Sequence, residues 1–203
     1  MNRPVKILLN SFAIITMIFG GFYLFIYLAF DGIFSGPIYS KQDLIENYEL
    51  RKSEITEVKS FIDSKVPAGR YINIEFDNGD LGIFHIQKDG KHQSNWDLDI
   101  DSEKTDSLLN VIGWTKNDLE KLESKLVSAN CISASSGNPT KIGWQRSAMA
   151  KYYYNVFDDN LNDSLIDVYN KGCVHIFYKD NIVLEYGSGA FGSICFPSYE
   201  RQE

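Results

Sequence analysis

Cysteines and histidines are the residues of this chain best suited to catalysis or metal binding. There are three of each: Cys131, Cys173 and Cys195, and His85, His92 and His175. Cys173 and His175 lie two residues apart and share one face of a predicted strand. A zinc site needs four ligands, usually in two close pairs, and this is the only close pair. The sequence therefore predicts no metal site. It leaves open a hydrolase that uses Cys131, His85 or His175, although no local pattern selects a base or an orienting group.

The same cysteines suggest a disulfide, because two of the three flank irregular segments. Cys173 lies inside a predicted core strand, so we expect it to be a buried thiol. The predicted bond is Cys131–Cys195. A cross-link closing so long a loop would contribute ~4 kcal/mol to stability.

An aromatic and basic segment is the strongest candidate for a contact surface. Trp144 and Arg146 are followed by three consecutive tyrosines that include Tyr152 and Tyr153. Tryptophan, arginine and tyrosine are enriched at protein interfaces. Strand alternation places Ile142, Trp144 and Arg146 on one face, so Trp144 has a core interpretation as well. We predict partner binding at Trp144, Arg146, Tyr152 and Tyr153.

Two further motifs resemble ligand-binding sites but lack sequence features that those sites require. The sequence Gly187-Ser-Gly-Ala-Phe-Gly192 matches the dinucleotide pattern, but the chain ends eleven residues later, with Pro197 between. Asp97, Asp99 and Asp101 begin like a calcium loop, yet Leu108 stands where a chelating glutamate is needed. We therefore predict no cofactor, no nucleotide and no metal.

The segment from Ile7 to Phe30 holds 24 residues without a charge. A helix of that length would be ~36 Å long, enough to cross a hydrocarbon core of ~30 Å. A cleaved signal peptide is the alternative, but the apolar run is long and the best cleavage site has Tyr27 at minus three. Arg3 and Lys6 precede the run, so the N-terminus is predicted to be cytoplasmic. The resulting division is a tail at 1–6, a transmembrane helix at 7–30, a linker at 31–39 and one extracytoplasmic domain at 40–203.

Charge limits the partners of that domain. All 27 acidic residues follow residue 30, with all of the 20 basic ones except Arg3 and Lys6. This acidic excess argues against nucleic acid, whose phosphates require a basic surface. A basic protein partner fits the charge better.

The elements of the domain follow from periodicity and turn signals. A helix begins at the N-cap Ser40 and ends before Pro67, with an apolar stripe from Leu44 to Ile62. Strands at 70–77 and 81–87 and a third ending at 101 are separated by Asn-Gly and Asp-Gly turns. Two helices follow, the second beginning at Thr115. Further strands are predicted at 131–135, 141–147, 150–157, 173–178 and 182–186 and near Ile194, with a helix at 161–169. Helices alternating with groups of strands indicate an α+β fold with a mainly antiparallel sheet.

The function that these features favour is binding without chemistry. We expect a membrane-anchored extracytoplasmic module that engages a protein partner, for instance an immunity-type factor that neutralises a basic toxin. Two alternatives stay open. One is an envelope hydrolase acting on cell-wall or peptide substrates, and the other is a structural subunit of a membrane complex that pairs through the helix at 40–63.

Overall fold

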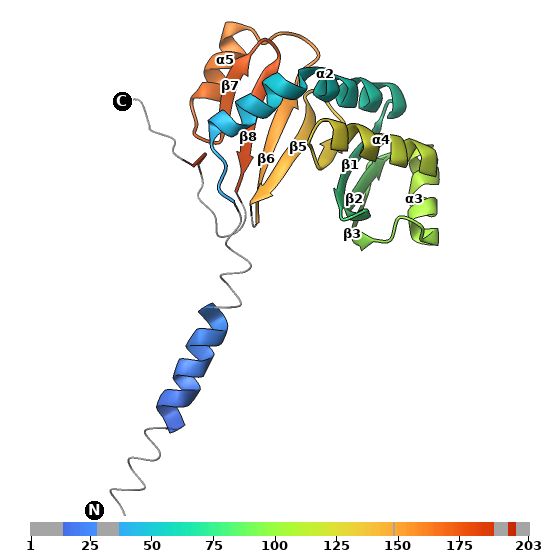
Figure 1. Ribbon diagram of the computed structural model, residues 1–203. Coiled ribbons are helices and arrows are strands. Elements are labelled where there is room, and N and C mark those ends of the chain that lie inside the picture. The colour runs from blue at the N-terminus through green and yellow to red at the C-terminus, as the bar shows by residue number, and fades with distance from the viewer. Residues whose placement is uncertain (1–13, 28–36, 148, 189–194, 198–203) are drawn as a thin grey trace, which may run out of the picture.

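The computed structural model describes residues 14–27, 37–147, 149–188 and 195–197. An antiparallel sheet of eight strands forms the domain, in the order β3-β2-β1-β4-β5-β6-β8-β7 (Figure 1). The predicted α+β fold is therefore confirmed. Its elements are α2 (Lys41–Lys65), β1 (Arg70–Asp77), β2 (Asp80–Lys88), β3 (Lys91–Leu98), α3 (Glu103–Ile112), α4 (Lys116–Ser128), β4 (Ser133–Ser135), β5 (Thr140–Ser147), β6 (Ala150–Val156), α5 (Asp163–Asn170), β7 (His175–Lys179) and β8 (Ile182–Gly187).

Local signals place the ends of these elements. Ser40 and Thr115 each form a capping box with the aspartate three residues later, so α2 and α4 begin where predicted. Asn78 and Gly79 both have positive φ, as a two-residue hairpin turn requires. The third strand is shorter than predicted. It ends at Leu98 because the backbone of Asp97 is left-handed and the next residues turn into α3.

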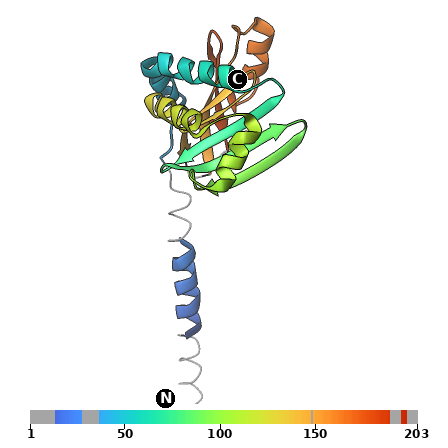
Figure 2. The same ribbon diagram turned by 90° about the vertical axis from the view of Figure 1, so that its right-hand side faces the viewer.

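The core lies between the sheet and the helices α2, α3 and α4. The predicted stripe of α2 is buried, including Leu44, Ile55 and Ile62. Two long-range hydrogen bonds fix this helix: Tyr154 donates to the carbonyl of Leu44, and the Trp114 indole donates to the carbonyl of Lys65. Figure 2 shows α2 and α4 on the same side of the sheet. We call the opposite side, which alternate strand residues such as Glu75, Tyr153 and Glu185 face, the open face.

The disulfide differs from the predicted one. Cys173 is bonded to Cys195, with Cα atoms 4.8 Å apart, and Cys131 is free and buried. The prediction Cys131–Cys195 is wrong because Cys173 does not lie inside the core strand. It precedes β7, where its carbonyl accepts a hydrogen bond from the N–H of Phe196, which brings Cys195 beside it. Cys131 follows α4, and its thiol donates to the carbonyl of Ala129.

The predicted membrane span lies only partly within the described residues. Residues 14–27 are helical with exposed side chains, and the remainder of 7–30 falls outside the description. Among the described residues, no helix is both long and apolar enough to cross a bilayer. Three other predicted features also fall wholly or mostly outside the described ranges: residues 31–36 of the linker predicted at 31–39, most of the glycine motif from 187 to 192, and the strand near Ile194.

Candidate functional site

Charged side chains gather at the centre of the open face. Strand pairing aligns one row of residues from β1 to β7: Glu75, Ser133, Gly143, Tyr153, Glu185 and His175. Three basic side chains from β5 and β6 reach this row. We define the charged cluster as Glu75, Lys141, Arg146, Lys151, Tyr153 and Glu185.

Glu75 links two of the cluster's cations. Its carboxylate accepts hydrogen bonds from Nε of Arg146 and Nζ of Lys151. Burial would raise the pKa of Glu75, but these two cations outweigh it and hold that pKa below its usual value. The side chains of Glu75 and Lys151 are 4% and 7% exposed, whereas that of Arg146 is 44% exposed. The guanidinium of Arg146 therefore extends from a buried ion pair to solvent.

Glu185 on β8, four strands from Glu75 on β1 in the sheet order, forms a second anchoring point. It accepts hydrogen bonds from Nζ of Lys141 at 2.6 Å and from Nδ2 of Asn155 at 2.9 Å, and Nε2 of His175 lies 3.4 Å from it. Burial opposes its ionisation, yet His175 and Lys141 together lower the pKa of Glu185 to about 2. This carboxylate is ionised at neutral pH and holds Lys141 in place.

Tyr153 lies between the two anchoring points. Nζ of Lys141 is 4.3 Å from the centroid of its ring and Nζ of Lys151 is 5.2 Å from it, both within cation–π range. Burial raises the pKa of Tyr153 to about 12, so the phenol keeps its proton. Three cations against two carboxylates leave the cluster with one positive charge in excess, within a domain that is acidic as a whole.

A β-bulge in β5 brings Arg146 to this face. Between Gly143 and Arg146, β5 has one residue more than the paired stretch of β6, which reverses the side on which the following residues point. The predicted common face for Trp144 and Arg146 is therefore wrong: Trp144 stays with the core. Gly143 is also required, because a Cβ there would lie 2.1 Å from Oγ of Ser133 and 2.5 Å from Cε of Lys151.

The four predicted contact residues thus separate into two pairs. Trp144 and Tyr152 are 6% and 1% exposed and pack with Tyr39 in an aromatic cluster, so neither presents a surface. Arg146 and Tyr153 lie on the open face. Sequence reasoning missed their partners, Glu75, Lys141, Lys151 and Glu185. The available signal was a charged residue within an apolar strand, as in Ile-Glu-Phe of β1 and Leu-Glu-Tyr of β8.

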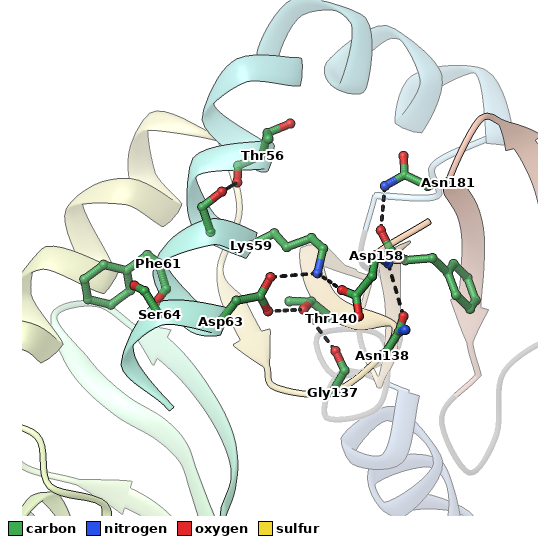
Figure 3. A network of polar contacts seen from close by, with 12 residues as sticks. Thr56, Lys59, Phe61, Asp63, Ser64, Gly137, Asn138, Thr140, Asp158 and Asn181 are labelled. Carbon is green, nitrogen blue, oxygen red and sulfur yellow. Dashed lines mark hydrogen bonds and ion pairs between the residues drawn. The ribbon is translucent and has the colours of Figure 1, made fainter. Parts of the chain in front are cut away.

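A pocket of 560 Å³ lies elsewhere, between the end of α2 and the loops before β5 and after β6. Two residues that line it, Asp63 and Asp158, accept hydrogen bonds from Nζ of Lys59, at 2.8 Å and 2.6 Å (Figure 3). Thr140 donates to Asp63, and the backbone N–H of Asp158 donates to Asn138. Burial lowers the pKa of Lys59, but the two aspartates outweigh it and raise that pKa overall. The network ties α2 to the two loops, which is a structural role.

The catalytic candidates are not brought together. Cys131 is 5% exposed, and burial raises its pKa far above the ordinary range for a thiol, so the thiolate needed for attack is disfavoured. His85 packs against Trp96, with ring centroids 5.0 Å apart. Within the described ranges, no group of three histidine, cysteine or acidic residues is arranged to hold a metal ion.

Comparison of the chain with protein-family models, with curated proteins and with solved structures finds no match. The geometry of the charged cluster is therefore the main indication of function.

Proposed function

We propose that this chain is a membrane-anchored binding module that holds its domain outside the cytoplasm and engages a protein partner through the open face. The observation that carries the proposal is the charged cluster. Its partly exposed members, Arg146 and Lys141, are fixed by carboxylates that are themselves buried. Side chains held in this way lose little conformational freedom when they bind, which favours recognition.

The anchor is the apolar run from Ile7 to Phe30, and the orientation rests on Arg3 and Lys6. The acidic domain suits a partner that is basic overall, such as a basic toxin for an immunity-type protein. At the cluster itself, the excess positive charge suits an acceptor group on that partner, either a carboxylate or a backbone carbonyl.

The hydrolase alternative has less support from the site. It requires an accessible nucleophile, whereas Cys131 is buried and Cys173 and Cys195 are bonded to each other. The alternative of a structural subunit that pairs through α2 is weakened by burial, because the apolar stripe of α2 packs on its own domain.

The test is photo-crosslinking of the full-length chain in its native membrane, with a photoreactive residue in place of Tyr153. We expect one dominant protein adduct, reduced when Arg146→Gln is added. Lys121→Gln is the matched control, since Lys121 is an exposed residue of α4 on the other side of the sheet. Equal adduct yields from Arg146→Gln and Lys121→Gln, or no adduct above background, would refute the proposal.

A further inference from the structure

One edge strand of the sheet, β7, is covered by a helix, whereas the other, β3, is exposed. At one edge, α5 packs beside β7, and the side chain of Asn170 accepts a hydrogen bond from the backbone N–H of Phe177. At the other edge, no described residue pairs with the outer side of β3, and most of this strand is exposed, including Trp96 at 59%. Exposed edges are usually blocked by proline, by a central lysine or by a covering segment. The only lysine of β3 is its first residue, and β3 has no proline.

The β2–β3 turn determines which backbone groups of β3 point outward. Asp89 and Gly90 form a two-residue turn, so Lys88 and Lys91 are the first hydrogen-bonded pair of the hairpin. Hydrogen-bonded and non-hydrogen-bonded pairs then alternate along an antiparallel ladder. The N–H and C=O groups of His92, Ser94 and Trp96 therefore point away from β2. A strand added to this edge must pair with these three residues.

The sequence of β3 is complementary to itself in this geometry. When a second β3 is placed antiparallel with Ser94 opposite Ser94, His92 faces Trp96 and Gln93 faces Asn95. Lys91 then faces Asp97, an opposite-charge pair that occurs twice. Asp97 has a left-handed backbone, so we expect no backbone hydrogen bonds between the two copies at this position. Each end of the β3–β3 pairing is held by the ion pair between Lys91 and Asp97.

Neighbouring registers are less favourable. Residues whose backbone N–H and C=O groups point away from β2 must pair with the equivalent residues of the second copy. The nearest alternative registers are therefore centred on Gln93 or on Asn95. Centring on Gln93 places Asp97 opposite Asp89, which are like charges. Centring on Asn95 places Trp96 opposite Ser94 and loses both aromatic pairs. The register centred on Ser94 matches charge, amide and aromatic residues together.

We propose that two copies of this chain associate through β3, antiparallel about Ser94, to form one continuous sheet with the two open faces on the same side. The occupant of the edge is thus a second copy. The free edge and the complementarity of β3 support this association, and neither depends on the proposed partner of the charged cluster.

Disulfide trapping of the full-length chain in detergent micelles tests this register. Ser94→Cys should form a disulfide-linked dimer, because the Cα atoms of an antiparallel hydrogen-bonded pair are about 5.5 Å apart. His92→Cys is the matched control: its own symmetry mate is four residues away along the strand, about 13 Å, so it should not cross-link alone. Mixed His92→Cys and Trp96→Cys chains should cross-link. The native cysteines are buried or already bonded.

Charge reversal gives a second readout that does not depend on cysteine. Lys91→Asp should weaken the dimer about two- to thirtyfold in sedimentation, since each change affects two ion pairs, and Lys91→Asp with Asp97→Lys should restore it. The proposal is overturned if Ser94→Cys gives no linked dimer, or if His92→Cys links as efficiently. A dimer that is held by the apolar N-terminal run alone would be unaffected by both charge variants, and this result would also overturn it.

Discussion

Replacing Glu75 by glutamine removes the negative charge that Arg146 and Lys151 share. The ammonium of Lys151 then stays buried without a carboxylate, and removing one partner of a buried ion pair typically costs about 3–5 kcal/mol. Arg146 adds little to this loss, because its side chain is 44% exposed and is solvated by water. For a domain of this size, each kcal/mol lowers the melting temperature by roughly 2–4 °C. We therefore expect Glu75→Gln to melt about 6–20 °C below the parent chain at pH 7.

The assay is thermal unfolding of the full-length chain in detergent micelles, followed by near-UV circular dichroism. Glu57→Gln is the matched control, because Glu57 pairs with Lys125 on the surface, and the loss of an exposed pair costs about 1 kcal/mol or less. Adding Lys151→Met to Glu75→Gln removes the unpaired ammonium and should recover most of the lost stability. Equal shifts for Glu75→Gln and Glu57→Gln would refute the reasoning, as would a double variant no more stable than Glu75→Gln.

Three further predictions concern pH, packing and the cysteines. The pKa of Glu185 is about 2 in the folded chain against 4.5 ordinarily, so the ionised carboxylate contributes about 3 kcal/mol to the free energy of unfolding. This contribution is complete above pH 4.5 and is lost as the pH falls from there to about 2. In Glu185→Gln, the urea concentration at the unfolding midpoint should therefore depend less on pH across that range. Gly143→Ala should destabilise the chain by about 1–3 kcal/mol through overpacking. Gly172→Ala should be close to neutral in the same assay, because a Cβ there would meet only the backbone nitrogen of Val174, at 4.0 Å. Alkylation of the denatured, unreduced chain should label Cys131 alone, and mass spectrometry after reduction should show two further labels; three labels before reduction would contradict the bond.

Local signals predicted most of the elements correctly. The capping boxes at Ser40 and Thr115 and the turn at Asn78-Gly79 involve residues within four positions of one another, so the sequence shows them directly. The apolar stripe of α2 was equally visible, because burial of one helix face imposes a period of 3.6 residues.

Non-local features could not be predicted in the same way. The bulge that turns Arg146 to the open face depends on how β5 pairs with β6, and simple alternation gave the wrong face. The bond between Cys173 and Cys195 depends on where the C-terminal segment returns. Glu75 and Lys151 lie 76 positions apart, so neither residue identifies the other in the sequence.

The position of α2 in the chain has a consequence for how the domain is made. This helix is synthesised before any strand, yet its polar and aromatic partners come late: Ala129 lies 82 residues after Asn47, and Tyr154 lies 110 residues after Leu44. At a synthesis rate of 5–20 residues per second, roughly 5–20 s pass before Tyr154 follows Leu44 out of the ribosome. During that interval the apolar stripe of α2 has no sheet to cover it. Folding must therefore wait for the second half of the chain, and an early-acting chaperone would find its target in α2.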